Sequence, residues 1–206
     1  MIENYLLIFT AVVIINWLVF RFFGKNFALD KPNSRKQHSK IKPQIGGLIF
    51  GAIFIFISII YDLAPNWFLI GGASIIILGL IDDNFKIPWK VKLILQIVIL
   101  FHALYYSWSV FDFINFYNYQ ILNNKPVLIF IFSLWFVGIL NAVNLIDGLD
   151  GLAGGIMLIF CLSSSFLYGP QLFLINLIFV ILLIAFLLFN QRPAKFFMGD
   201  TGSLFL

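Results

Sequence analysis

Long apolar runs, separated by short polar stretches, repeat along almost the whole chain. A helix needs about 20 apolar residues to cross the hydrocarbon core of a bilayer. Runs near this length lie at residues 5–23, 45–62, 66–81, 91–110, 126–141, 151–168 and 171–189, and an eighth begins near Thr201. The pattern predicts an all-α integral membrane protein, a polytopic bundle of about seven or eight transmembrane helices forming one domain over 1–206. The third and fifth runs are short, so we expect their ends to lie in protein rather than lipid.

The composition agrees with a chain surrounded by lipid. Of its 206 residues 62% are hydrophobic and only 11% are charged, whereas a soluble domain carries charges at roughly 25% of positions. A single cysteine, Cys161, excludes a disulfide framework. No nucleic-acid partner is expected. Because Met1–Asn4 lack the basic leader of a signal peptide, we expect the first run to be a permanent span.

The basic residues indicate how the bundle is oriented. Twelve of the thirteen lysines and arginines follow the first, third or seventh run, and only Lys125 lies in a loop of the opposite parity. Loops that are rich in lysine and arginine stay in the cytoplasm. The N-terminus is therefore predicted to lie outside, in the multi-pass arrangement of a cytoplasmic-membrane protein.

Acidic residues gather where apolar runs meet the predicted cytoplasmic loops. The set comprises Asp82, Asp83, Asp147, Asp150 and Asp200. A charge at such a depth is unfavourable and is a functional candidate by default. Helix capping explains any one of them alone, but five on one face of the membrane favour a function.

The adjacent pair Asp82 and Asp83 ends the third run, and Lys86 and Lys92 follow closely. Neighbouring residues on a helix point about 100° apart. One carboxylate can therefore face a metal or phosphate while lysines hold the other. The alternative is an Asp–Lys network that only ends the helix.

Two further segments carry polar groups in regular patterns. One repeats a polar residue at every third position: Asn141, Asn144, Asp147 and Asp150. If helical, these residues form one stripe, and Gly148 permits a turn whose N–H groups suit a nucleobase or phosphate. The other, Gly199–Ser203, sets Asp200 at a helix N-terminus, which suits a metal-bound phosphate or a plain N-cap.

Because two spans separate each polar segment from the next, all of them are predicted to return to one side. Oxygen-rich clusters without cysteine bind hard cations such as Mg²⁺. Phosphoryl transfer needs that metal and cationic groups, here Lys40, Lys86, Lys92 and Arg192. The alternative is a transporter or flippase with an acidic cytoplasmic vestibule, although transporters place such residues nearer the midplane.

These segments, in this order, resemble those of the polyprenyl-phosphate N-acetylhexosamine-1-phosphate transferases, glycosyltransferase family 4. The likeness rests on the Asp-Asp pair, Asn-x-x-Asn-x-x-Asp-Gly-Leu-Asp-Gly and Phe-Met-Gly-Asp-x-Gly-Ser. It implies that a UDP-N-acetylhexosamine gives its sugar-1-phosphate to undecaprenyl phosphate and releases UMP, with Mg²⁺ required and Mn²⁺ as a substitute. It also implies a bacterial inner-membrane protein whose active site faces the cytoplasm, with room for a homodimer.

The resemblance carries roles onto individual positions. It implies that Asp82 and Asp83 face the acceptor and that Asp200 is the magnesium ligand. The implied nucleotide-binding turn consists of Asn144, Asp147, Gly148, Leu149 and Asp150. Phe197 matches the aromatic residue that stacks on uracil, and Asn190 is its polar neighbour. The lysines that match those near the phosphates are Lys86 and Lys92.

The first basic loop favours one branch of the family. Arg35, His38 and Pro43–Gly47 are similar to the N-acetylglucosamine-1-phosphate transferases of teichoic acid and O-antigen synthesis, and Lys40 lies between them. Taken alone, these charges equally suit anionic lipid headgroups. Family members continue beyond the Gly-Asp-x-Gly-Ser turn with further spans and a histidine-rich loop. The chain is therefore expected to be incomplete at its C-terminus, and an inactive remnant is a further alternative.

Overall fold

A computed structural model describes residues 2–24, 28–30, 41–107, 125–167 and 170–206. Its helices are α1 (Ile2–Phe23), α2 (Gly46–Ile60), α3 (Asn66–Phe85), α4 (Trp89–Tyr106), α6 (Lys125–Ile146), α7 (Leu152–Ser165), α8 (Pro170–Asn190) and α9 (Gly199–Ser203). A two-stranded antiparallel ladder, β1 (Leu29–Asp30) with β2 (Lys42–Pro43), lies between α1 and α2.

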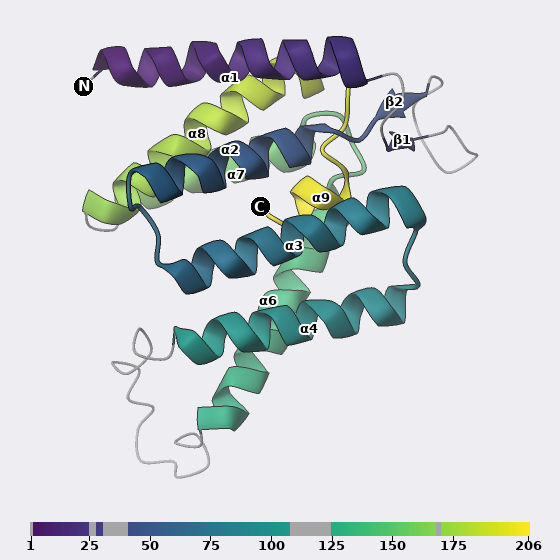
Figure 1. Cartoon of the computed structure of the whole chain (residues 1–206), viewed down its shortest axis with the longest axis vertical. Coiled ribbons are helices and arrows are strands. Elements are labelled where there is room, and N and C mark those ends of the chain that lie inside the picture. Colours follow the sequence, from purple (N-terminus) through teal and green to yellow (C-terminus); the bar gives the residue numbers. More distant parts are fainter. Residues whose placement is uncertain (1, 25–27, 31–40, 108–124, 168–169) are drawn as a thin grey trace.

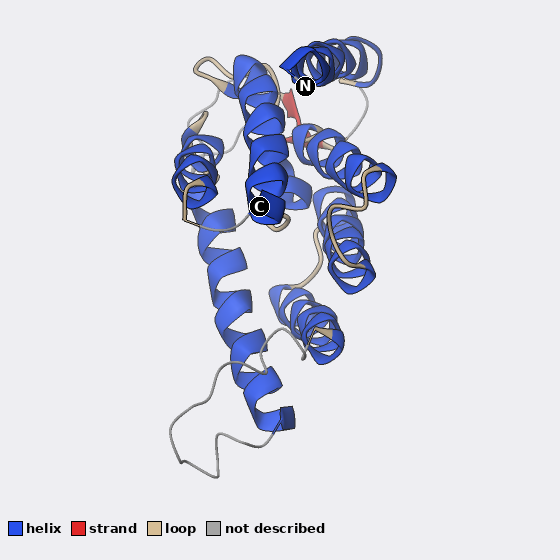
Figure 2. Ribbon diagram, turned by 90° about the vertical axis from the view of Figure 1, so that its left-hand side faces the viewer, coloured by secondary structure: helices blue, strands red, loops and turns tan. Residues whose placement is uncertain are grey.

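The helices form a bundle in which α1, α2, α3 and α4 stand side by side in chain order (Figure 1). Helix α6 packs on α4 and is steeply inclined to the row (Figure 2). Helix α8 packs against α7, α1 and α2. The short helix α9 lies in the middle, in contact with α2, α3 and α6.

The expected all-α polytopic membrane fold is confirmed. Among the described residues, five helices are long and apolar enough to cross a membrane (α1, α3, α4, α6 and α8), and α2 and α7 are shorter apolar helices. Large apolar side chains such as Phe22, Trp135 and Phe160 cover the outside, as expected for a surface in contact with lipid.

The expected shortness of two spans is wrong. Helix α3 extends to Phe85 and α6 extends to Ile146, giving 20 and 22 residues. The polar residues that end the apolar runs remain helical because their side chains find partners inside the bundle, as described below for Asp82 and Asn144.

Aromatic side chains fill the space between α2 and α8. Phe54 is fully buried, and its ring centroid lies 4.1 Å from that of Phe179. Phe205, just beyond α9, stacks on Phe179 at 6.1 Å and meets Phe54 edge-on at 5.7 Å. This packing joins the residues that follow α9 to the core of the bundle.

Two glycines allow α9 to lie directly against the backbone of its neighbours. A Cβ atom on Gly47 of α2 would overlap the backbone of Gly202, and one on Gly79 of α3 would overlap the backbone of Thr201. Backbone atoms cannot rotate away as a flexible side chain can. The position of α9 is therefore fixed by contacts that only glycine permits.

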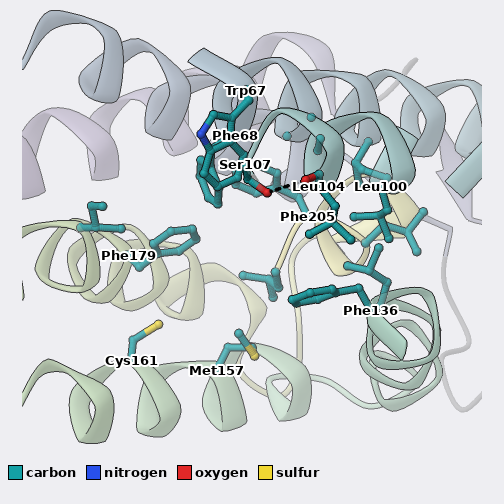
Figure 3. Close-up of a pocket in the computed structure, with 18 of the residues that line it drawn as sticks. Trp67, Phe68, Leu100, Leu104, Ser107, Phe136, Met157, Cys161, Phe179 and Phe205 are labelled. Atoms are coloured by element: carbon teal, nitrogen blue, oxygen red, sulfur yellow. Dashed lines mark hydrogen bonds between the residues drawn. The ribbon is translucent and has the colours of Figure 1, made fainter. Parts of the chain in front are cut away.

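An apolar cavity of about 460 Å³ lies inside the bundle, farther along the helices than the polar segments. Figure 3 shows the side chains that line it. Trp67, Phe136, Met157 and Phe205 are among the residues that line it. On α4 its lining begins at Leu100, eight residues or about 12 Å beyond Lys92. The cavity wall is almost entirely apolar, so the charged side chains of the polar segments lie outside it.

Candidate active site

The segment that leads into α2 and the segment that leads into α9 are joined by backbone hydrogen bonds. The Phe197 N–H donates to Pro43 O at 2.8 Å, and the Gly46 N–H donates to Phe197 O at 3.0 Å. The next bond along runs from the Gly47 N–H to Met198 O at 2.9 Å. The segment that leads into α9 is thereby held beside the start of α2.

One lysine lies between two carboxylates from different elements. Lys92 Nζ on α4 is 3.0 Å from Asp82 Oδ2 on α3 and donates a short hydrogen bond to Asp200 Oδ2 on α9. The other oxygen of Asp82 accepts the Ile87 N–H at 2.7 Å. Residues 82, 92 and 200, far apart in the sequence, therefore meet at one point, as the predicted shared side requires.

Helix α6 completes this cluster with an amide. Asn144 Nδ2 donates to Asp200 Oδ1 at 3.0 Å and to Ser203 Oγ at 2.8 Å. One turn earlier on α6, Asn141 Nδ2 donates to Oε1 of the fully buried Gln96 on α4 at 2.8 Å. Polar contacts between α4 and α6 thus form two layers, with Asp200 in the outer one.

Asp83 has a different environment from its neighbour. Its Oδ1 accepts the Asp200 N–H at 2.8 Å, and its Oδ2 accepts the Thr201 N–H at 3.0 Å and the Thr201 hydroxyl at 2.6 Å. The side chain is 4% exposed. Asp83 therefore caps α9 from outside the helix, whereas Asp200 itself does not act as the side-chain cap that its position allowed.

The charge state of Asp200 follows from its partners. Burial acts to raise the pKa of this carboxyl, but its contacts with Asp82, Lys92 and Asn144 outweigh that effect and lower the pKa to about 2. Asp200 is thus an anion at neutral pH, balanced by the Lys92 ammonium.

Asp147 lies in the turn that follows α6, outside the spanning helices. Burial, followed by the negative charges of Asp200 and Asp83, raises the pKa of Asp147 to about 8. Its carboxyl therefore faces the same acidic region without a cation of its own among the described residues.

The predicted single helical stripe is correct only for Asn141 and Asn144, because the helix ends at Ile146.

Asp150 and Asn190 join the turn after α6 to the segment before α9. Asp150 Oδ2 accepts the Ala194 N–H at 2.9 Å and lies 3.6 Å from Lys42 Nζ. Asn190, 3% exposed, accepts the Gly151 N–H at 2.9 Å and donates to Phe196 O at 2.9 Å. Both side chains thus act on the backbone around Phe197.

The sequence of the chain is similar to those of known proteins. The family described as glycosyl transferase family 4 matches residues 66–206, which contain every member of the Lys92 cluster. The chain belongs to this family. A probable undecaprenyl-phosphate N-acetylglucosaminyl 1-phosphate transferase of Bacillus subtilis (strain 168) is 35% identical over 95% of the chain and 57% of its own length.

Two further similar proteins match nearly the whole chain. The undecaprenyl-phosphate alpha-N-acetylglucosaminyl 1-phosphate transferase of Thermotoga maritima is 35% identical over 90% of the chain and 55% of its own length. A phospho-N-acetylmuramoyl-pentapeptide-transferase of Petrotoga mobilis is 32% identical over 97% of the chain and 68% of its own length. The chain thus spans little more than half of the first two relatives.

Some residues implied by the family resemblance lie away from the cluster. Lys86 is exposed, follows α3 with a left-handed backbone (φ 53°), and makes no ion pair within the described residues. Gly148 and Leu149 are exposed in the turn after α6. Arg35, His38 and Lys40 lie outside the described residues.

Other residues enter the site without having been singled out from the sequence as site residues. Thr201 and Ser203 belong to the Gly-Asp-x-Gly-Ser turn, and their hydroxyls bond Asp83 and Asn144. Gln96 lies one helical turn after Lys92, a spacing that places both on one face of α4. Lys42 is one of several basic residues in the loop before α2, and nothing in the sequence distinguishes it from the others.

The carboxylates fit a magnesium ion that is completed by substrate. Within the described part of the chain, no three His, Cys, Asp or Glu side chains could hold a metal alone. Magnesium is usually bound by one or two carboxylates together with water and substrate phosphates. Asp82 and Asp200, which already share one ammonium, could supply those carboxylates.

Proposed function

We propose that the protein transfers N-acetylhexosamine-1-phosphate from a UDP-sugar to undecaprenyl phosphate and releases UMP. One observation carries this proposal: the ammonium of Lys92 on α4 contacts the carboxylates of Asp82 on α3 and Asp200 on α9. Two carboxylates and a lysine are the groups that a magnesium-dependent phosphoryl transfer requires. The names of the similar proteins, which include an undecaprenyl-phosphate acceptor, support the same reaction class.

The reaction balances without a proton acceptor. An oxygen of the acceptor phosphate attacks the sugar-bearing phosphorus of the donor, and the bond from that phosphorus to the bridging oxygen breaks. UMP leaves with the electron pair, and the product is a lipid diphosphate sugar. Because the second pKa of a phosphate monoester is about 6, the acceptor is already mostly dianionic at pH 7. Asp82 is thus proposed to position charge rather than to remove a proton.

The chain's own residues divide into binding and positioning groups. Asp200 and Asp82 would hold Mg²⁺, which supplies neutralisation of phosphate charge when bound. Lys92 would contact the transferring phosphate, and Asn144 orients Asp200. Asp83 holds the backbone that carries Asp200. Phe197 and the turn at Asp147–Asp150 would bind the uridine part of the donor.

The sugar, the pathway and the side of the membrane are proposed from the sequence and from the names of the relatives. N-acetylglucosamine is the proposed sugar, because the first loop resembles that branch and the first two relatives are named for it. The reaction would start the synthesis of teichoic acid or another surface polysaccharide. The polar end is proposed to face the cytoplasm, because its loops carry nearly all the basic residues.

UMP release by the purified full-length protein tests the proposal. The protein in detergent micelles is incubated with undecaprenyl phosphate and a panel of UDP-sugars, with Mg²⁺, Mn²⁺ or EDTA. We expect UMP only when a divalent ion and UDP-N-acetylglucosamine are both present. Formation of the lipid diphosphate sugar in an amount equal to UMP distinguishes transfer from hydrolysis.

Two variants connect the activity to the cluster. Asp82→Asn and Asp200→Asn each keep the size of the side chain but remove its charge, so both should abolish turnover. Near-normal rates in both would refute the assignment. Absence of UMP with every sugar, combined with uptake or flipping of a labelled lipid by proteoliposomes, would favour the transporter class instead.

A further inference from the structure

Lys42 lies where three separate segments of the chain meet. Its ammonium is 4.8 Å from the centroid of the Phe197 ring and 3.6 Å from Asp150 Oδ2. Lys42 belongs to β2, Asp150 to the turn before α7, and Phe197 to the segment before α9. Neither the reaction chemistry nor the Lys92 cluster makes use of this lysine.

Of the two contacts that Lys42 makes, the one with the Phe197 ring has the more favourable distance. A cation within about 6 Å of a ring centroid is attracted by the electron-rich face. The separation from Asp150 is longer than a hydrogen bond, and that oxygen already accepts the Ala194 N–H. The Lys42 side chain is only 14% exposed, so weak solvation strengthens its attraction to the ring.

The backbone of Phe197 is fixed by hydrogen bonds, but these bonds do not fix the orientation of its ring. Hydrogen bonds to Pro43 and from Gly46 hold the backbone on both sides, yet they do not set the side-chain torsions. A group lying over the ring does limit them. Asp200 follows three residues later, so the two Cα atoms are at most about 11 Å apart. The residue that carries the ring is therefore close in space to the residue proposed to hold the metal at the phosphate site.

We infer that Lys42 is a positioning residue for the nucleobase of the donor: its ammonium, steadied by Asp150, holds the Phe197 ring in the orientation on which the base stacks. This inference rests on the proposed function, because it takes the donor to be a uridine nucleotide. Fixing the ring before binding removes an ordering penalty from the binding step. Lys42 thus contributes to affinity through Phe197 rather than through the phosphates.

Calorimetric titration of the full-length protein with UMP and with uridine tests this role. Lys42→Met keeps the apolar stem and removes the charge, and it should weaken UMP binding about 3- to 10-fold. Lys42→Arg, which retains a cation, should bind nearly as well as wild type. Lys90→Met is the matched control, because Lys90 lies 5.6 Å from the exposed Trp89 ring, and it should leave affinity unchanged.

A double-mutant cycle distinguishes action through the ring from direct contact with phosphate. In a Phe197→Leu background, Lys42→Met should change UMP affinity less than 2-fold, because the ring on which it acts is gone. Uridine, which has no phosphate, should show the same loss with Lys42→Met as UMP. A loss seen with UMP but not with uridine would overturn the inference, and so would an unchanged loss in the Phe197→Leu background.

The outcomes also separate this inference from the proposed function. If wild type binds neither UMP nor uridine, the uridine-nucleotide donor is wrong and the role of Lys42 is wrong with it. If wild type binds UMP and Lys42→Met binds it equally well, only the role of Lys42 is wrong. Thermal unfolding of each variant should match wild type within a few degrees, which shows that a changed affinity does not reflect a lost fold.

Discussion

Asp83 Oδ2 accepts two hydrogen bonds from Thr201, one from its backbone N–H at 3.0 Å and one from its hydroxyl at 2.6 Å. The other Asp83 oxygen accepts the N–H of Asp200. Helix α3 thus holds the start of α9 through one carboxylate, while the adjacent Asp82 turns to Lys92. The adjacent acids therefore have separate partners: Asp83 holds the backbone of α9, and Asp82, which contacts Lys92, is the one proposed to act in the reaction.

This division predicts different effects of two neighbouring substitutions. Asp83→Ala leaves three buried donors without an acceptor and should lower the free energy of unfolding by about 3 kcal/mol, at roughly 1 kcal/mol each. Asp82→Asn retains an acceptor for Ile87 and should unfold near the wild-type temperature while losing turnover. Thermal unfolding in detergent, measured beside UMP release, checks both, and equal unfolding temperatures would contradict the capping role.

Removing the shared ammonium should make the protein depend on metal for its stability. Lys92→Met leaves Asp82 and Asp200 close together without a cation between them, so the unfolding temperature in EDTA should fall. Added Mg²⁺ should restore much of it, since a ligand bound only by the folded state stabilises that state. Turnover should fall about 100-fold or more. Lys90→Met, two residues away and exposed, should change neither quantity.

Asp147 should make the metal-free protein less stable as the pH rises. Its folded pKa of about 8 lies above the ordinary value of 3.8. The folded state therefore keeps a proton that the unfolded state loses between these values, and stability declines through that range. Asp147→Asn cannot titrate, so the difference between its unfolding temperature and that of wild type should increase in its favour from pH 5 to 8. Above pH 8 this difference should stay constant. A constant difference across these pH values would exclude the raised pKa.

The glycine contacts of α9 allow a matched pair of substitutions. Gly79→Ala drives a methyl group into the backbone of Thr201, and such overpacking destabilises by about 1–3 kcal/mol. Gly155→Ala on α7 meets nothing within 4 Å and should be neutral or stabilising by up to about 1 kcal/mol. Unfolding temperature and turnover of the two proteins provide the comparison. A harmless Gly79→Ala would show that α9 has room to move.

Hydropathy predicted the helices but not where two of them end. The apolar run near 126–141 ends at Asn141, yet α6 continues for five more residues, to Ile146. Asn141 bonds Gln96 and Asn144 bonds Asp200, so neither amide meets lipid. These partners come from other helices, and a count of apolar residues along one segment does not contain them.

The site could be located from the sequence, although the tasks of its residues could not. Motif order and span parity were enough to expect Asp82, Lys92 and Asp200 at one place. The 100° between neighbours showed that Asp82 and Asp83 face different ways, but which one meets α9 depends on residues more than 100 positions later. Lys42 was one basic residue among seven in its loop, and only the packing of Phe197 sets it apart.

The clamped position of α9 also bears on how the protein must be handled. At Gly47 and Gly79 the five-residue helix that carries Asp200 lies directly against the backbone of α2 and α3. A small movement of those helices therefore shifts the Asp200 carboxylate. Harsh detergents, which remove the lateral pressure of the bilayer, should abolish turnover while circular dichroism still shows intact helices. Reconstitution into a bilayer should then restore turnover without any refolding.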